Sequence, residues 1–370
     1  MDVSPDCIAL VCNGELEKNQ NTKIKIEECT TCIGVDGGLN YCRDLQIKPH
    51  WIVGDFDSVE SQVLQQLQEN SDAVKLLRAK DETDLEIAVE KAKQLSPHAQ
   101  IKIFGGLGGR LDHTLGNLYI ALRNPGRVFL ESEQQRLFAV DRGLGKVEIV
   151  EQHMQTLVLF PLYGKAQLLL EQSDGSFHLY TLDKCPLVFP FSQRCNLQVL
   201  QGEVIVCLDA SDCFNTSSRS LPIDFSLKQP FIHTFEHLYR LSTHADQLPL
   251  SSSSETVYRI HPSSGKCSFP CHVGETVSLI PLYGLVSGIQ TEGLKWELGP
   301  QTLSQLDKNF VGISNVCVGE MFSVQVTSGE LLCIINHGLI DRELLQEEIE
   351  KTRLFHTTRL IVDREHPMPG

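Results

Sequence analysis

Acidic residues follow the points where short apolar runs end in the first third of the chain. The run Trp51-Ile-Val-Gly-Asp-Phe-Asp-Ser58 stops abruptly at Asp55 and Asp57, and such a bounded apolar run is typical of a buried strand. Side chains alternate along an extended segment, so these two carboxylates point the same way. Adjacent hard oxygen ligands suit Mg2+, which leaves its other positions to water and phosphates. The plainer interpretation is an Asx-type turn that caps a following helix at Ser58.

The same event is predicted at three other strand ends. Those ends carry Asp36, Asp81 with Asp84, and Arg110 with Asp112. Helical patterns separate the strands at residues 59–67, 85–95 and 115–122. Strands that alternate with helices favour an α/β fold with a parallel, doubly wound sheet. Ligands of such sheets bind beyond the carboxyl ends of the strands, so we expect the four acidic ends to line one edge.

Composition narrows the class of protein. A chain of 370 residues is long enough for two or three domains. Its 47 acidic residues against 32 Lys and Arg give a net charge of -15, which opposes binding to nucleic acid. No apolar run is long enough to span a membrane and the first residues do not resemble a signal peptide, so a cytoplasmic location is expected. The 13 cysteines are scattered through apolar runs, as expected of reduced thiols. Neither Cys29-Thr-Thr-Cys32 nor Cys267 with Cys271-His272 has a matching partner pair at zinc-finger spacing, so a zinc site is disfavoured.

From residue 128 onward the pattern changes to short alternating strands, and part of it is repeated. Thr156-Leu-Val-Leu-Phe-Pro-Leu-Tyr-Gly164 returns as Thr276-Val-Ser-Leu-Ile-Pro-Leu-Tyr-Gly284, an offset of 120 residues. We interpret this as an internal duplication of a β-sandwich-like unit. The predicted organisation is an α/β nucleotide-binding domain at 1–127, a first β unit at 128–210, an insert or linker at 211–255, a second β unit at 256–336, and a C-terminal helix and tail at 337–370.

Three motifs of the α/β part together resemble the thiamine pyrophosphokinase family. In chain order they are Gly54-Asp-Phe-Asp-Ser58, Lys80-Asp-Glu-Thr-Asp84 and Gly109-Arg-Leu-Asp-His-Thr-Leu-Gly-Asn117. The second β unit adds Gly293-Leu-Lys-Trp296 and Ile313-Ser-Asn315, which look like the C-terminal signature of that family. The resemblance covers residues 7 to about 164 and about 255 to 335.

The resemblance implies a homodimeric, Mg2+-dependent enzyme with its site at the subunit interface. Such an enzyme transfers the terminal diphosphate of ATP to the hydroxyethyl group of thiamine, giving thiamine diphosphate and AMP. Carried over to this sequence, the metal and polyphosphate residues would be Asp36, Asp55, Asp57 and Asp84. The residues near the nucleotide would be Asp36, Lys80, Asp81, Gly109, Arg110 and Asp112. Those near thiamine would be Trp296, Ser314 and Asn315, and the catalytic candidates are Asp55, Asp57, Asp84 and Arg110.

The chemistry of these residues agrees with that reaction. Transfer of phosphoryl-type groups depends mainly on positioning and on neutralising charge, which carboxylates holding Mg2+ and the cations Arg110 and Lys80 would supply. Thiamine is a cation, so the indole face of Trp296 could stack on it, although Trp296 can equally be a core residue. The sequence leaves open whether Asp84 or an oxygen on the metal accepts the alcohol proton.

The first β unit departs from the family pattern. It has Ser176-Phe-His178 where the second unit has Leu294-Lys-Trp296, so we interpret it as a degenerate, structural copy that could even stand in the place of a partner subunit. Two other functions stay open, a related diphosphokinase acting on a hydroxymethylpterin and a non-catalytic sensor of nucleotide or thiamine. A dinucleotide-binding dehydrogenase is disfavoured because no Gly-x-Gly-x-x-Gly follows the first strand.

Overall fold

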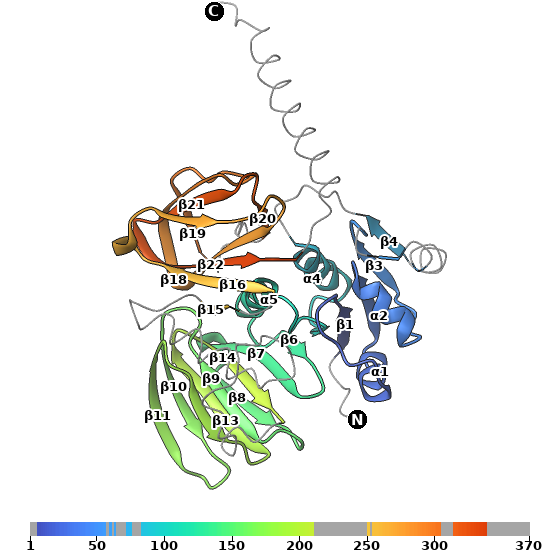
Figure 1. Cartoon of the computed structure of the whole chain (residues 1–370). Coiled ribbons are helices and arrows are strands. Elements are labelled where there is room, and N and C mark those ends of the chain that lie inside the picture. Colours follow the sequence, from blue (N-terminus) through green and yellow to red (C-terminus); the bar gives the residue numbers. More distant parts are fainter. Residues whose placement is uncertain are drawn as a thin grey trace, which may run out of the picture.

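The computed structural model describes most of the chain, and Figure 1 shows how its parts are arranged. The described residues are 6–56, 59, 60, 63, 72–75, 83–210, 250, 251, 254–304 and 314–338. Several predicted features lie outside them, namely Asp57, Lys80, Asp81, most of the insert at 211–255, and the C-terminal helix and tail beyond residue 338.

Six neighbouring strands form the parallel half of a large sheet. Their order is β6-β5-β1-β2-β3-β4, and each neighbouring pair is parallel. The strands are β1 (Cys7–Val11), β2 (Thr31–Val35), β3 (Trp51–Gly54), β4 (Asp72–Lys75), β5 (Gln100–Phe104) and β6 (Val128–Glu131). The strand order reverses at β1, and ligands of open α/β sheets bind beyond the carboxyl ends at such a point.

Helices cover both faces of this parallel half. They are α1 (Gln20–Glu27), α2 (Gly38–Asp44), α4 (Asp84–Leu95) and α5 (Leu111–Leu122). Ile8 and Leu10 of β1 belong to a buried cluster with side chains of α4 and α5. Ala9, which points to the opposite face, lies in a second cluster with Ile26 of α1 and Cys42 of α2. Burial on both faces explains why these strands are almost continuously apolar in the sequence.

The large sheet continues past residue 128, where the sequence predicts that the first β unit begins. β6 pairs in parallel with β5 and antiparallel with β7 (Gln135–Asp141). The sheet then runs through β14 (Glu203–Asp209), β9 (Thr156–Phe160) and β12 (Leu187–Pro190), all antiparallel. The predicted α/β class is therefore confirmed as a mixed α/β fold, and the ten-stranded sheet as a whole is mixed rather than parallel.

The first β unit is a sandwich whose two layers share one apolar core. One layer is the antiparallel half of the large sheet, and the other is a four-stranded sheet in the order β11-β10-β13-β8. The strands of the second layer are β8 (Lys146–Val150), β10 (Lys165–Glu171), β11 (Phe177–Asp183) and β13 (Arg194–Gln201), with a 3-10 turn, η1, at Arg142–Leu144. Leu168 and Leu197 of this layer pack with Val206 of β14 between the sheets.

The second β unit is built around one long bent strand, β18 (Thr276–Glu292). The first part of β18 pairs with β22, the last part pairs with β21, and the register shifts between Leu282 and Ser287. One strand therefore contributes to both layers. The other elements are β15 (Leu250–Ser251), β16 (Glu255–Ile260), η2 (Pro262–Ser264), β17 (Cys267–Pro270), β19 (Gln301–Leu303), β20 (Asn315–Val316), β21 (Met321–Gln325) and β22 (Ser328–Asn336).

The two β units share strand pairing residue for residue. Val140 pairs with Val204 in the first unit and Ile260 pairs with Leu331 in the second, at offsets of 120 and 127 residues. All six pairs between β16 and β22 have a counterpart between β7 and β14 at the same offsets. Even an ion pair recurs, between Lys146 and Glu171 in one unit and Lys266 and Glu292 in the other. Matching residue pairs of this kind are expected if the two units arose by an internal duplication.

Helix α5 lies between the two β units, as Figure 1 shows. Its residue Leu118 belongs to one buried cluster with Leu137 of β7 and Leu279 of β18. The Tyr119 hydroxyl donates a hydrogen bond of 2.9 Å to the carbonyl oxygen of Pro281 in β18. The second β unit is therefore packed directly on the helix that follows the glycine-rich loop. No helix within the described residues has the length and apolar character needed to cross a membrane.

Candidate active site

Three of the predicted acids meet at the carboxyl edge of the parallel strands. Asp36 follows β2, Asp55 follows β3, and Asp84 is the first residue of α4. One carboxylate oxygen from each lies within 4.8 Å of the others, and all three residues are partly exposed. We call these three residues the acid triad. The structure brings them together, while their role as metal ligands stays a prediction.

The backbone around the acid triad is folded tightly. Asp36 has a φ of 43° and Phe56 a φ of 64°, values that residues other than glycine rarely adopt and that often occur at functional sites. The Asp36 N–H donates to the Val53 carbonyl oxygen at 2.8 Å, which holds the ends of β2 and β3 together. A Cβ atom added at Gly54 would lie 3.0 Å from the Asp36 Cα, so the approach favours glycine.

The start of α4 fixes the third acid. Thr83 caps this helix in a capping box, in which its side chain accepts from the Glu86 N–H and the Glu86 carboxylate accepts from the Thr83 N–H. Asp84 therefore sits in the first helical turn, where the positive end of the helix dipole stabilises a carboxylate.

The acid triad fits a divalent cation that prefers oxygen ligands. Carboxylate oxygens are the usual protein ligands of Mg2+, Ca2+ and Mn2+. An octahedral ion with bonds of about 2.1 Å holds neighbouring ligand oxygens about 3 Å apart. Oxygens within 4.8 Å of one another can reach that spacing by small rotations of the side chains. Among the described residues, those that could hold a divalent metal are thus Asp36, Asp55 and Asp84.

A glycine-rich loop leads from β5 to α5 at the same edge of the sheet. At Gly105 an added Cβ atom would lie 2.5 Å from the Cys12 carbonyl oxygen, so the loop can cross the end of β1 only because it carries glycine here. β1 alone separates β5 from β2, which puts the loop about 10 Å from Asp36, two strand spacings away. The acid triad and the loop therefore border the same edge.

Two backbone N–H groups at the start of α5 are already engaged. The Leu111 N–H donates to both carboxylate oxygens of Glu255, at 3.0 and 3.1 Å. The His113 N–H donates to Asp112 Oδ1 at 2.9 Å. These two N–H groups are therefore not available to an anion in the conformation described. Among the described residues at this helix start, the Arg110 side chain is a cationic group that an anion could contact.

Asp112 anchors the Arg110 side chain. Arg110 donates to it through two nitrogens, Nε to Oδ1 at 3.0 Å and NH2 to Oδ2 at 2.6 Å. Burial would raise the pKa of the Asp112 carboxyl, but the neighbouring charges of His113 and Arg110 and the hydrogen bonds from Arg110 and Ser278 lower it to about 2. Asp112 is only 1 % exposed, so the carboxylate that orients Arg110 is itself buried. Its predicted position beside the nucleotide stays a prediction.

Arg110 also reaches across to the second β unit. Its NH2 nitrogen donates to Ser314 Oγ at 2.9 Å, and the His113 Nε2 atom lies 3.4 Å from the same oxygen. Ser314 has a φ of 61°, so it too occupies the left-handed region that serine seldom adopts. The structure thus joins a residue predicted to bind nucleotide to one predicted to bind thiamine, within a single chain.

Asn315 positions Trp296. The backbone N–H of Trp296 donates to Asn315 Oδ1 at 3.1 Å, and Asn315 Nδ2 donates to the backbone carbonyl oxygen of Trp296 at 2.7 Å. The Trp296 residue is 48 % exposed, which argues against the interpretation of Trp296 as a core residue. The ammonium of Lys295 lies 4.6 Å from the centroid of the indole ring, so this face already attracts a cation.

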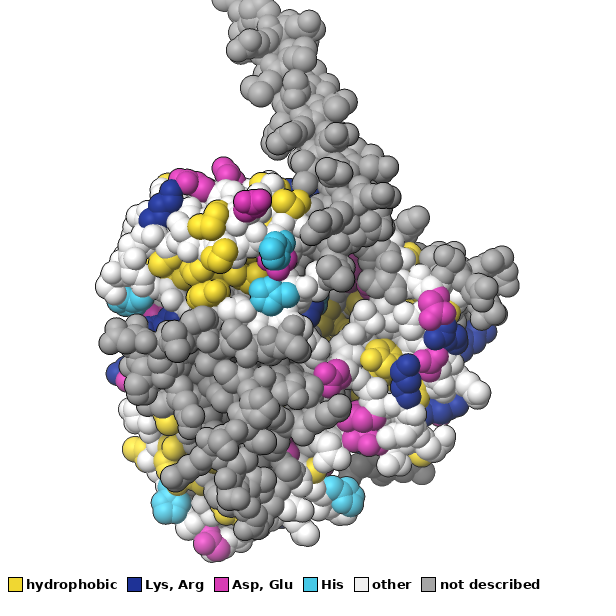
Figure 2. Space-filling view, in the orientation of Figure 1, with side chains coloured by type: hydrophobic (Ala, Val, Ile, Leu, Met, Phe, Trp, Pro, Cys, Tyr) yellow, Lys and Arg dark blue, Asp and Glu magenta, His cyan; other side chains and the backbone are white. Residues whose placement is uncertain are grey.

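Exposed apolar side chains accompany Trp296 on the second β unit. Figure 2 shows apolar side chains gathered on one face of this unit. Trp296, Met321 and Val318 are among the more exposed large apolar residues of the chain. These residues come from neighbouring segments. Gly293 packs against the backbone of Met321, and the carbonyl oxygen of Gly293 accepts a hydrogen bond from the Val318 N–H. An apolar surface beside a polar network suits an aromatic ligand with a charged end.

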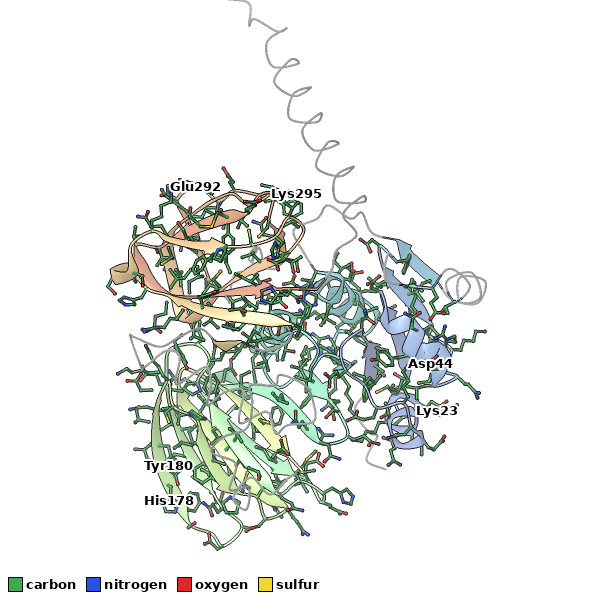
Figure 3. The ribbon with its side chains drawn as sticks, in the orientation of Figure 1. Lys23, Asp44, His178, Tyr180, Glu292 and Lys295 are labelled. Atoms are coloured by element: carbon green, nitrogen blue, oxygen red, sulfur yellow. The ribbon has the colours of Figure 1, made fainter. Side chains whose placement is uncertain are left out.

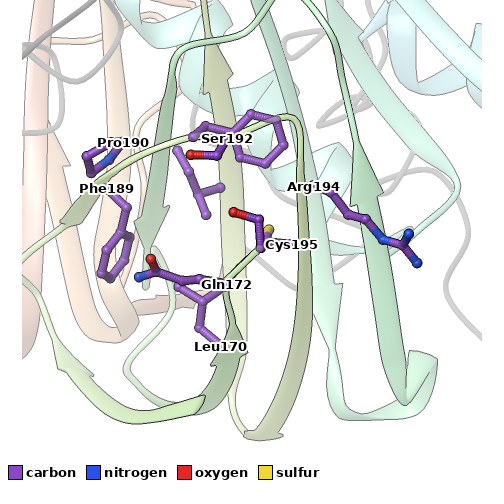
Figure 4. A pocket seen from close by; sticks show the side chains of 10 residues that line it. Leu170, Gln172, Phe189, Pro190, Ser192, Arg194 and Cys195 are labelled. Atoms are coloured by element: carbon purple, nitrogen blue, oxygen red, sulfur yellow. The ribbon is translucent and has the colours of Figure 1, made fainter. Parts of the chain in front are cut away.

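The first β unit has no matching set of residues. Figure 3 shows His178, from the segment that aligns with Trp296, on β11 at the far side of the molecule from Lys295. A small pocket at the end of the first β unit is lined by Phe189, Gln172 and the cation Arg194 (Figure 4). The residues that line this pocket include no carboxylate that could attract a cationic ligand, and Arg194 forms an ion pair with Glu148. These observations agree with the interpretation of the first unit as a structural copy.

Sequence reasoning missed two buried residues of the second β unit. Ser278, which is fully buried, donates to Asp112 Oδ2 at 2.5 Å and accepts from the Ser314 N–H at 2.8 Å. Glu255 is the carboxylate that caps α5. Their counterparts 120 residues earlier are Val158 and Gln135. The replacement of Val158 by a serine and of Gln135 by a glutamate in the second repeat was the sequence signal that could have identified these two residues.

Replacing Glu255 by glutamine is expected to flatten the dependence of stability on pH. Burial, then the charge of Asp112, raise the pKa of Glu255 to about 7, although the Leu111 N–H and Arg110 oppose the shift. The folded state therefore holds a proton that the unfolded chain releases near pH 4.5. Folding stability falls as pH rises between these two values, by about 3 kcal/mol at about 1.4 kcal/mol per unit.

Urea unfolding at several pH values between 5 and 8 measures this effect. Glu255→Gln should gain stability relative to the parent as pH rises across that window. Parallel pH profiles for the two proteins would contradict the assignment of a proton to Glu255.

Two family models match separate parts of the chain. Residues 22–129 match the model described as "Thiamin pyrophosphokinase, catalytic domain". Residues 259–331 match the one described as "Thiamin pyrophosphokinase, vitamin B1 binding domain". The first match contains the acid triad and Arg110, and the second contains Ser278, Trp296 and Ser314. The match to the vitamin-binding domain therefore falls on the second β unit.

One curated relative and several solved structures are similar to parts of this chain. A thiamine pyrophosphokinase of Bacillus subtilis (strain 168) is 40% identical over 95 residues, which are 25% of this chain and 44% of the relative, so the alignment spans less than half of that protein. The crystal structure of thiamine pyrophosphokinase from Bacillus subtilis is similar over 56% of this chain and 100% of its own, with 25% identity and a TM-score of 0.45. That of Candida albicans covers 56% and 90%, with 15% identity and a TM-score of 0.46. By its motifs and by the two family models, this chain matches both domains of the thiamine pyrophosphokinase family, over residues 22–129 and 259–331.

Proposed function

We propose that this chain transfers the terminal diphosphate of ATP to the hydroxyethyl group of thiamine, giving thiamine diphosphate and AMP. The observation that carries the proposal is the hydrogen bond between Arg110, in the part that matches the catalytic domain, and Ser314, in the part that matches the vitamin B1-binding domain. It puts an anion-binding cation beside a candidate thiamine-binding residue.

The acid triad would hold Mg2+ together with the polyphosphate of ATP. Bound there, Mg2+ would neutralise phosphate charge, which is the main requirement of this class of transfer. Asp36, Asp55 and Asp84 have the oxygen donors and the spacing for it. Asp57, Lys80 and Asp81 stay predicted contributors from outside the described residues. The parallel half would then serve as a doubly wound nucleotide-binding sheet with its ligand at the edge where the strand order reverses.

Arg110 would bind the diphosphate as it moves between its two partners. Asp112 fixes the guanidinium through two hydrogen bonds, so its remaining N–H groups are aimed without losing side-chain freedom on binding. Gly109 precedes it with open space around its Cα, where a phosphate oxygen could approach. Asp84 is the carboxylate at the edge that could accept the alcohol proton of thiamine.

Trp296 and Asn315 would bind the ring system of thiamine. Substituting Trp296 by alanine should raise the KM for thiamine about tenfold, because stacking a cation on an indole contributes about 1 to 2 kcal/mol. The KM for ATP should stay close to the parent value. Trp51→Phe is the matched control, since it alters the other tryptophan of the chain at the start of β3. Equal thiamine KM values for Trp296→Ala and the parent would contradict this role.

Two alternatives are distinguishable. A pterin diphosphokinase could use the same acids, but the match of the second β unit to a vitamin B1-binding domain favours thiamine. A non-catalytic sensor would have no need of the acid triad, which is assembled here.

The test is to incubate the purified chain with ATP, Mg2+ and thiamine and to separate the products by chromatography. Thiamine diphosphate and AMP should appear in equal amounts. ADP as the nucleotide product, turnover only with a hydroxymethylpterin, or no product at all would contradict the proposal.

A homodimer and a cytoplasmic location stay predictions. Because this chain itself supplies both Arg110 and Ser314, a second copy is not needed to bring them together. Light scattering coupled to size-exclusion chromatography measures the oligomeric state, and activity of a monomeric peak would show that the site is complete within one chain.

A further inference from the structure

Four side chains form a closed ring of hydrogen bonds where the second β unit meets α5. Asp112 Oδ2 accepts from Arg110 NH2 at 2.6 Å and from Ser278 Oγ at 2.5 Å. Ser278 Oγ accepts from the Ser314 N–H at 2.8 Å, and Ser314 Oγ accepts from Arg110 NH2 at 2.9 Å. A serine hydroxyl has one donor and two acceptor sites, so Ser278 can make both of its contacts at once.

A second buried contact secures the same helix turn. The Glu255 carboxylate, 1 % exposed, accepts from the Leu111 N–H, one of the N–H groups that the first turn of a helix leaves without an internal partner. Glu255 and Ser278 lie on β16 and β18, so two strands of the second β unit hold Leu111 and Asp112.

The repeated unit supplies an internal comparison. At the positions of Ser278 and Glu255, the first β unit has Val158 and Gln135. Val158 lies in an apolar cluster, and Gln135 donates to Asp209 within its own unit. Burying a hydroxyl or a carboxylate is unfavourable unless it is paired. The buried hydroxyl of Ser278 and the buried carboxyl group of Glu255 therefore occur in the copy that contacts the start of α5 and Ser314.

We propose that Ser278 and Glu255 are positioning residues that fix the second β unit on the first turn of α5 and thereby hold Ser314 against Arg110. This inference rests on the proposed function, since it identifies what sets the spacing between the thiamine and diphosphate sites. Ser314 depends on Ser278 directly, because its left-handed backbone is held by the N–H bond to the Ser278 hydroxyl. Arg110 keeps two bonds to Asp112 without Ser278.

Because Ser314 depends on Ser278 and Arg110 does not, loss of the Ser278 hydroxyl should affect thiamine binding more than ATP binding. Ser278→Ala should raise the KM for thiamine about tenfold and leave the KM for ATP within about twofold. Ser278→Thr keeps the hydroxyl and should restore the thiamine KM to within about threefold of the parent. Thr156→Val is the control, because it removes a buried hydroxyl from β9 of the first β unit. Equal changes in both KM values, or no rescue by threonine, would reduce Ser278 to a structural residue and overturn the proposal.

Two substitutions test Glu255 in the same assay. Glutamine keeps an acceptor for the Leu111 N–H, whereas methionine has a similar length and no strong acceptor. Glu255→Gln should keep a thiamine KM near that of the parent, and Glu255→Met should raise it about tenfold. The same KM in both variants would contradict the positioning role of Glu255.

A measurement without turnover separates this inference from the proposed function. The unfolding equilibrium constants of Ser278→Ala, Asp112→Asn and the double variant form a thermodynamic cycle. If the ring exists, the increase in the unfolding equilibrium constant of the double variant should be about tenfold smaller than the product of the increases in the two single variants. Additive effects would overturn the inference even in an active enzyme, whereas absence of thiamine diphosphate with clear coupling would overturn only the proposed function.

Discussion

Replacing Asp55 by asparagine should lower kcat about 100-fold or more. The substitution keeps the size of the side chain but removes one of the three negative charges of the acid triad. Neutralisation of phosphate charge by a bound divalent metal contributes several kcal/mol to transfers of this class, and each 1.4 kcal/mol corresponds to about tenfold in rate. The loss should be partly reversed by raising the Mg2+ concentration, because an amide oxygen is a weaker ligand that still binds the ion.

The control is Asp183→Asn, which removes a carboxylate from the exposed edge strand β11 of the first β unit. It lowers the net negative charge of the protein by the same amount and should leave kcat unchanged. Circular dichroism of both variants checks that the fold is retained. If Asp55→Asn turned over as fast as the parent, Asp55 would not be a metal ligand in the reaction.

Replacing Arg110 by lysine should lower kcat/KM about 10- to 100-fold with the charge retained. The ammonium of lysine cannot reproduce the two parallel bonds to Asp112 together with the bond to Ser314. A guanidinium that loses this fixed orientation no longer meets the diphosphate in a single geometry. The protein should stay folded because a cation still faces the buried Asp112 carboxylate, whose removal from any partner would be strongly destabilising.

Arg123→Lys is the matched control for this experiment. Arg123 lies at the other end of α5 and forms an ion pair of 2.5 Å with Glu86 in α4, away from the second β unit. Its substitution should alter stability slightly and kcat/KM by less than about twofold. Comparable losses in the two variants would show that Arg110 acts through helix stability rather than at the diphosphate.

The sequence was sufficient to predict the assembly of the acid triad, for a definite reason. In a parallel sheet, strands that are adjacent in space end at one edge, so Asp36, Asp55 and Asp84 could be placed together from their positions after apolar runs. The close passage of the following loop over the end of β1, where Gly105 lies against the Cys12 carbonyl oxygen, was not predicted. Local sequence patterns are enough to predict that distant residues meet when, as in a parallel sheet, the fold class itself places the strand ends at one edge.

Other features depend on contacts between distant segments and had no local pattern. The pairing of β6 with β7 extends the parallel sheet into the first β unit, and a strand of four residues does not reveal which strand lies on each side of it. The partner of the Leu111 N–H is Glu255, 144 residues away, and Ser278 stands in a run that reads as ordinary core. Comparing the two repeats position by position would have singled out both residues.

The duplication gives one chain two β units with different tasks. The first extends the large sheet and contacts α5 through apolar side chains, such as Leu137. The second adds polar contacts to the start of α5 and carries Ser314 and Trp296. A duplicated unit that keeps its register can change its buried polar residues while the strand pairing is preserved, since the backbone bonds carry the fold.

Binding of Mn2+ in place of Mg2+, followed by electron paramagnetic resonance in the presence of a non-hydrolysable ATP analogue, tests the central claim most directly. The parent should bind one ion with the nucleotide, and Asp36→Asn, Asp55→Asn and Asp84→Asn should each weaken its binding about tenfold or more, while Asp183→Asn binds as the parent does. Unchanged Mn2+ binding in all three triad variants would contradict the account that the ends of these neighbouring strands hold the metal and its nucleotide.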